Sequence, residues 1–296
     1  MKTVLVLGLT FVSGALCAQP IPFGSALDAD QQIQESRQLA KQVLSASTER
    51  RAKGDQHRTY HFPAANKAMP YRLYVPTTWD GQSSLPLVVM LHGAGSDENR
   101  YMDAHNQQLI HLAEQHGYVV ASPLGYSPLG AYGTPLRLPA VFGQPETAAK
   151  QRAAVTPEAE HTLELSEKDV INVLEIVLNE YPINRSAVFL MGHSMGSGGT
   201  WYLGAKYSKY WRAIAPMSGP FVDQANYPWD HLKSIPIMMS EGTLALPSVQ
   251  GSRVMRDWMF QQDLTFEYYE VKADHGGMVP LVLPAVVDFF DRYREK

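Results

Sequence analysis

The 296-residue sequence contains one cysteine, Cys17, and this scarcity excludes several kinds of chemistry. Residues 1–18 have the pattern of a secretory signal: Lys2, an apolar run from Val4 to Val12, and a small-residue region that ends at Ala18. Cleavage after Ala18, or after Cys17, leaves a mature chain without cysteine. Disulfides, a cysteine nucleophile and a thiolate metal site are therefore excluded. We expect a secreted or periplasmic protein.

Strong charge, long apolar runs and nucleotide motifs are also missing. A formal net charge of -4 gives no support for nucleic acid or an anionic membrane as a partner. The apolar run of the signal is too short to span a bilayer. Neither a P-loop nor a dinucleotide fingerprint is present, so we expect no cofactor. His57 and His61 have metal-ligand spacing only on a helix, and with no third ligand nearby we expect no metal site.

The remaining pattern predicts one α/β domain. Residues 24–53 predict an amphipathic surface helix. Strands are expected at Thr59–Ala64, Tyr71–Val75, Pro86–Leu91, Tyr118–Ser122, Ala187–Met191, Ala213–Ser218, Pro236–Ser240 and Thr265–Val271, with helices near 97–116, 166–181, 195–207, 250–262 and 280–294. This alternation indicates a mostly parallel, eight-stranded sheet with helices on both faces. Residues 126–160 fit no element and are expected to form either a lid or wall of the site, or a surface excursion.

The most informative motif is Gly192-His193-Ser194-Met195-Gly196. It follows the apolar run 187–191 and precedes a predicted helix, which is the strand–turn–helix setting of a nucleophile elbow. We therefore expect Ser194 to be a nucleophile. The same glycines could serve a tight turn alone, so the prediction depends on whether partner residues occur elsewhere in the right order.

Two further segments supply such partners. His275 lies between Asp274 and Gly276-Gly277, after the last predicted strand, where a general base belongs in the chain order serine, acid, histidine. The sequence His92-Gly93-Ala94-Gly95 follows the third predicted strand. It predicts an oxyanion hole formed by the backbone amides of Ala94 and Met195.

The acid of the expected catalytic set is harder to assign. It usually follows the seventh strand, and there Ala245 occupies the position where an aspartate would be expected. Glu241, at the end of that strand, is the favoured candidate, and Asp223, beyond the sixth strand, is the alternative. Asp274 is a neighbour of His275 and is expected to point away from it.

These motifs resemble those of secreted bacterial α/β-hydrolases, above all feruloyl esterases and polyhydroxybutyrate depolymerases. The resemblance extends more loosely to the prolyl-oligopeptidase-type catalytic domain and covers residues 58–294. It implies an α/β-hydrolase domain at 58–296, after the signal at 1–18 and a helical extension at 19–57. Five aromatic residues are expected either around the mouth of the site or in the core: Tyr126, Tyr132, Trp201, Tyr202 and Trp229.

The function expected from the sequence is hydrolysis of carboxylic esters by Ser194, His275 and Glu241 through an acyl-enzyme. The substrate would be a small-molecule or polymer ester, such as an aromatic feruloyl-type ester or a polyester. The alternatives are a prolyl-oligopeptidase-type peptidase and a degenerate hydrolase fold that only binds ligands. The oligomeric state is left open.

Overall fold

The computed structural model of the chain describes residues 24–47, 50–143 and 156–294. The predicted signal at 1–18 lies outside these residues. The strands are β1 Gly54–Phe62, β2 Lys67–Val75, β3 Leu85–Leu91, β4 Val119–Pro123, β5 Ile183–His193, β6 Ala213–Met217, β7 Ile237–Gly242 and β8 Phe266–Val271. The α-helices are α1 Ala29–Ala46, α2 Arg100–His116, α3 Leu138–Val141, α5 Pro157–Glu180, α6 Met195–Lys206, α7 Ser248–Gln261 and α8 Val279–Arg294.

All eight strands belong to one sheet, in the order β1-β2-β4-β3-β5-β6-β7-β8. The β1–β2 and β2–β4 pairs are antiparallel, and every pair from β4–β3 to β7–β8 is parallel. The predicted mostly parallel, eight-stranded sheet is therefore confirmed. Because the parallel strands end at one edge, the loops after β3, β5, β6, β7 and β8 can meet there.

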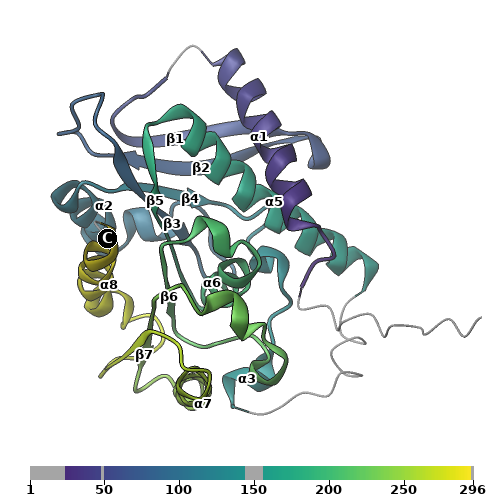
Figure 1. Cartoon of the computed structure of the whole chain (residues 1–296), viewed down its shortest axis with the longest axis vertical. Coiled ribbons are helices and arrows are strands. Elements are labelled where there is room, and N and C mark those ends of the chain that lie inside the picture. The colour runs from purple at the N-terminus through teal and green to yellow at the C-terminus, as the bar shows by residue number, and fades with distance from the viewer. Residues whose placement is uncertain (1–23, 48–49, 144–155, 295–296) are drawn as a thin grey trace, which may run out of the picture.

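Helices cover both faces of the sheet (Figure 1). Apolar side chains of α1, α5, α6 and α7 pack on one face, and those of α2 and α8 pack on the other. In β5, Val188 and Leu190 point to the first face, whereas Ala187, Phe189 and Met191 point to the second. This alternation is the period of a strand that is buried on both sides, and it explains the continuous apolar run seen in the sequence.

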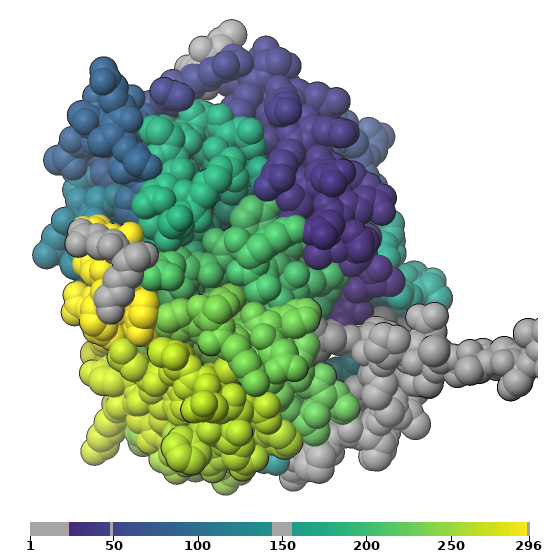
Figure 2. Space-filling model, in the orientation of Figure 1, coloured from purple at the N-terminus to yellow at the C-terminus, as the bar shows by residue number. Residues whose placement is uncertain are grey.

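The N-terminal helix α1 packs along α5, which places it over one face of the sheet (Figures 1 and 2). Polar contacts hold the two helices together: Ser36 Oγ donates to Asn172 Oδ1 at 2.6 Å in a buried hydrogen bond, and Nε of the half-exposed Arg37 pairs with the buried Glu175 at 3.0 Å. Buried polar groups of this kind require their partners, because an unpaired one is costly. The expected helix within residues 24–53 is thus observed at Ala29–Ala46.

Part of the segment 126–160 is more regular than the sequence indicated. It contains a 3-10 turn at Ala131–Gly133 and the short helix α3, and α5 already begins at Pro157. The start of α5 is fixed by Thr156, whose side chain accepts from the Ala159 amide at 3.2 Å. Within the described residues, none of the helices combines the length and apolarity needed to cross a membrane.

Candidate active site

Ser194 stands at the junction between β5 and α6, in the expected sharp turn. Its backbone has φ 59° and ψ -118°, values that a non-glycine residue adopts only under constraint. The turn is held by the Ser194 amide, which donates to Met217 O of β6 at 3.0 Å. A Cβ at Gly196 would lie 2.3 Å from the Leu91 carbonyl oxygen, so only glycine allows α6 to pass the end of β3 this closely.

The loop after β8 brings His275 to this serine. Its Nε2 lies 2.9 Å from Ser194 Oγ, within hydrogen-bond distance, although the residues are 81 positions apart. Burial lowers the pKa of His275 below its usual value, while the negative charges of Glu241 and Asp274 oppose that effect. A neutral ring can accept the proton of the serine hydroxyl.

The other nitrogen of the His275 ring faces a residue that the sequence did not single out. Nδ1 lies 2.7 Å from Ser218 Oγ, and that hydroxyl donates to Glu241 Oε1 at 2.9 Å. The carboxylate of Glu241 is fully buried. Among the described residues no carboxylate contacts the ring directly. Glu241 thus belongs to the site, but Ser218 stands between it and His275.

Both oxygens of Glu241 are occupied. Oε1 accepts from Ser218, from the Gly242 amide at 2.9 Å and from Ser248 Oγ at 3.2 Å. Oε2 accepts from the Gly219 amide at 2.9 Å and from Ser252 Oγ at 2.6 Å. A carboxylate with this many donors is held in one orientation.

His193, inside the elbow, supports the His275 loop. Its Nε2 lies 2.6 Å from the His275 carbonyl oxygen, and its Nδ1 lies 2.6 Å from Tyr101 Oη. A carbonyl can only accept, so Nε2 carries the proton and Nδ1 accepts from the tyrosine. Burial lowers the pKa of His193 to about 3, with a further contribution from His275, and the ring is therefore neutral.

The loop after β3 lies directly against the elbow. A Cβ on Gly93 would be 3.4 Å from the Ser194 Cβ, and Ala94 is the next residue in this loop. The Gly95 amide donates to Pro128 O at 2.8 Å and anchors this loop. Met195 is the first residue of α6, where backbone amides have no acceptor within the helix.

The other two carboxylates considered from the sequence, Asp223 and Asp274, make their hydrogen bonds within their own turns. Asp223 caps a 3-10 turn, where it accepts from the Ala225 amide at 3.2 Å and from Asn226 Nδ2 at 2.6 Å. Asp274 accepts from the Gly277 amide at 2.6 Å, so its side chain is used within its own turn. Neither makes a hydrogen bond to the His275 ring.

The five aromatic residues lie in or against the hydrophobic core, the second of the two placements expected from the sequence. Tyr132 and Trp201 are fully buried, Tyr202 is 1% exposed and Trp229 is 6% exposed. All four belong to the main hydrophobic core, against which Tyr126 packs while only partly buried. For Trp201 and Tyr202 the reason is that α6 is buried on all sides, so these side chains pack inward instead of facing a substrate.

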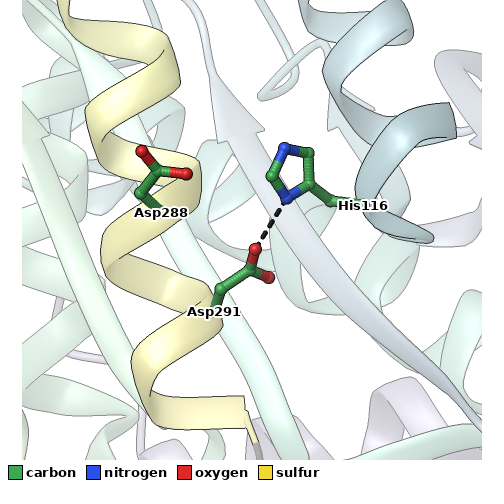
Figure 3. Close-up of side chains that lie close together, drawn as sticks. All are labelled: His116, Asp288 and Asp291. Carbon is green, nitrogen blue, oxygen red and sulfur yellow. Dashed lines mark hydrogen bonds and ion pairs between the residues drawn. The ribbon is translucent and has the colours of Figure 1, made fainter.

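One group outside the site has the composition of a metal centre. His116, Asp288 and Asp291 lie close together where α2 meets α8 (Figure 3). His116 Nδ1 contacts Asp291 at 2.6 Å, and Arg294 and Tyr118 also bind this carboxylate, at 3.3 Å and 2.9 Å. These contacts already satisfy Asp291, and the arginine supplies the positive charge. The contact between His116 and Asp291 therefore joins α2 to α8.

Comparison of the sequence with known protein families identifies the family of this chain. The family model Esterase, described as "Putative esterase", matches residues 63–262, more than half of the chain. The chain belongs to the esterase family. The match includes Ser194, Ser218 and Glu241 and ends before His275. No curated protein matches the sequence.

Solved structures of similar fold include hydrolases from several organisms. Fluorophosphonate-binding serine hydrolase F of Staphylococcus aureus is 16% identical, with a TM-score of 0.59 over 81% of this chain and 99% of that one. S-formylglutathione hydrolase of Agrobacterium tumefaciens is 12% identical, with a TM-score of 0.61 over 83% and 99%. A ferulic acid esterase of Anaeromyces mucronatus, in complex with ferulic acid, is 15% identical, with a TM-score of 0.56 over 84% and 93%. The esterase is thus an α/β-hydrolase that acts on carboxylic esters.

Proposed function

We propose that this esterase is a secreted serine hydrolase that cleaves its ester through a Ser-His-acid mechanism with an acyl-enzyme. Ser194 would be the nucleophile, His275 the general base and Glu241 the acid. The observation that carries the proposal is the 2.9 Å contact between Ser194 Oγ and His275 Nε2 at a strained strand-to-helix turn. Nucleophile and base within hydrogen-bond reach, with the base oriented by a third group, is the arrangement that covalent catalysis requires.

In the first step, Ser194 Oγ would attack the ester carbonyl carbon while His275 Nε2 takes the hydroxyl proton. Collapse of the tetrahedral intermediate would expel the alcohol, which receives that proton, and leave the acyl group on the serine. Water, deprotonated by the same ring, would then release the acid. The low pKa of His275 keeps the ring available as a base at neutral pH.

The negative oxygen of the intermediate needs donors fixed in advance. We assign this role to the backbone amides of Met195 and Ala94. Two observations support it: Met195 opens α6, and the loop that carries Ala94 touches the elbow at Gly93. A helix N-terminus favours negative charge, and removal of one such donor typically costs about 10²–10³ in kcat.

For the substrate, we propose aromatic esters of the feruloyl type or polyesters. The support is the fold shared with ferulic acid esterases, one of them solved with ferulic acid bound. The aromatic side chains of α6 are buried, so they are not available to contact an aromatic substrate. Secretion is supported by the pattern of residues 1–18.

Covalent labelling tests the proposal. A fluorophosphonate should modify the wild-type protein at Ser194 and leave Ser194→Ala unlabelled. Hydrolysis rates on aryl esters, alkyl esters, a polyester film and peptide anilides would then define the substrate. If the folded protein forms no adduct, the proposal is wrong and the protein would be a hydrolase fold that only binds ligands. Faster cleavage of the anilides would indicate a peptidase.

A further inference from the structure

The contact between Ser218 and His275 departs from a direct histidine–carboxylate pair. The His275 ring is oriented by a neutral hydroxyl at 2.7 Å, and the carboxylate lies one hydrogen bond farther away. We propose that Ser218 is a positioning residue of the esterase. It would transmit the orienting effect of Glu241 to His275, in a chain of hydrogen bonds that runs from Ser194 to the buried carboxylate. This inference rests on the proposed roles of Ser194 and His275.

The hydrogen positions follow from the chemistry of the four groups. Glu241 as a carboxylate can only accept, so the single hydroxyl hydrogen of Ser218 points toward it. Ser218 Oγ then has only lone pairs left for His275, and Nδ1 must be the protonated nitrogen of the ring. Nε2 is consequently unprotonated and faces Ser194 Oγ as an acceptor. The carboxylate thus selects the tautomer that a general base needs, without touching the ring.

The backbone is arranged to hold this serine in place. Ser218 has φ 62°, in the left-handed region that non-glycine residues rarely adopt. Its amide donates to Ser240 O at 2.9 Å, so the ends of β6 and β7 are tied together beside the two side chains. Because Met217 pairs with Ser240 in the parallel register, Ser218, the residue after β6, lies beside Glu241 of β7.

Burial makes the hydroxyl hard to replace. Ser218 is fully buried, so its hydroxyl is not in contact with bulk solvent. When His275 takes the proton of Ser194, the Nδ1–H remains bonded to an oxygen that Glu241 polarises. The charged groups that face the ring are Glu241 and Asp274, and His193 beside it is neutral. No proton has to be transferred to Glu241 at any step.

The test uses Ser218→Ala, Glu241→Gln and the double variant, each assayed on the ester that the wild type cleaves fastest. Each single variant should lower kcat at least about tenfold, with KM changed less than about threefold. The kcat of the double variant should lie within about threefold of the kcat of the slower single variant, because the two residues act as one unit. The acid limb of the pH profile should move to lower pH in both single variants, since the protonated ring loses stabilisation.

The matched control is Ser240→Ala. Its hydroxyl is buried beside Glu241 in the chain, and Oγ makes no hydrogen bond to any described residue. We expect kcat to fall less than about threefold, and the midpoint of the acid limb to stay where it is in the wild type. If Ser240→Ala and Ser218→Ala are equally slow, or if the two single effects of Ser218→Ala and Glu241→Gln multiply in the double variant, Ser218 has no linking role.

A spectroscopic measurement separates this proposal from the proposed function. Nitrogen NMR of histidine-labelled protein, with the ring of His275 neutral, should show the Nδ1–H tautomer in the wild type and its loss in Ser218→Ala. Unchanged tautomer in that variant would overturn the proposal even with kcat reduced. The tautomer can be read without turnover, so an inactive wild type would refute the proposed function and leave this inference open to its own test. Should Glu241→Gln fail to fold, Ser218→Ala alone still decides.

Discussion

The close passage of α6 over the end of β3 allows a sharp prediction for Gly196→Ala. The new Cβ would lie 2.3 Å from the Leu91 carbonyl oxygen, 2.7 Å from the Leu91 carbonyl carbon and 2.9 Å from the His92 carbonyl oxygen. Real Cβ contacts essentially never fall below 3.0 Å, so the backbones must separate by about 0.7 Å. All three clashing atoms belong to the main chain, and no side-chain rotation can relieve them.

This displacement acts where the chemistry is expected. The Leu91–Gly95 loop carries the predicted oxyanion donor Ala94, and Ser194 precedes Gly196 by two residues. A misplacement of about 1 Å can cost about 10²-fold in rate, so we expect kcat/KM on a short aryl ester to fall about 10- to 100-fold. Overpacking should also lower the free energy of unfolding by about 1–3 kcal/mol or more.

The matched control is Gly276→Ala in the His275 loop. A Cβ there meets nothing within 4 Å, and this glycine does not have a positive φ. We expect kcat/KM within about threefold of wild type and an unchanged urea midpoint. A folded Gly196→Ala protein with kcat/KM equal to the control would refute the reasoning, because it would show that the elbow can move without loss of geometry.

Three further predictions concern pH and packing. Because burial lowers the pKa of His275, the acid limb of a kcat/KM–pH profile should have its midpoint below about pH 6.5; a midpoint above 7 would contradict this. His193 has a pKa of about 3 in the fold and about 6.5 unfolded. The unfolded chain therefore binds the extra proton, and His193 alone should lower the free energy of unfolding by about 2 kcal/mol from pH 7 to pH 5. His193→Gln should lose less over the same range in urea titrations. Ser36→Ala breaks a buried hydrogen bond to Asn172 and should lower the free energy of unfolding by about 1–3 kcal/mol. The control Glu35→Ala removes an exposed ion pair and should lower it by less than about 0.5 kcal/mol. Equal losses in the two variants would mean that the buried bond between α1 and α5 stabilises the fold no more than the exposed pair.

The fold could be predicted because its signals are local and periodic. Continuous apolar runs marked the buried strands, and the structure extends the run 187–191 to Ile183–His193 without changing its role. Ser194 and His275 were expected at the ends of β5 and β8, and the structure brings them into contact. The order of the residues along the chain was sufficient to predict this contact, because the loops after parallel strands lie at the same edge of the sheet.

Helix boundaries and side-chain directions were predicted less well. The start of α5 at Pro157 follows a threonine cap and a proline at the first turn, a signal that is present in the sequence but was masked by the loop-like composition before it. The aromatic residues of α6 could have faced either way. Their direction depends on the packing of α6 between the sheet and its neighbours, which no local pattern reveals.

The proposed acid was the hardest residue to assign from the sequence, because its neighbours depend on how two strands pair. Ala245 occupies the usual aspartate position, and the nearest carboxylate in sequence, Asp274, is used in its own turn. Glu241 reaches the site only through Ser218, and these residues are neighbours because β6 pairs with β7 in the observed register. With the proposed acid inside β7, the carboxylate is fully buried and has five donors, but it lies too far away to bond to the ring. The hydroxyl of Ser218, just after the adjacent strand, closes that distance, since it can accept from the imidazole and donate to the carboxylate at once. The absence of an aspartate at 245 therefore does not imply an unsupported histidine.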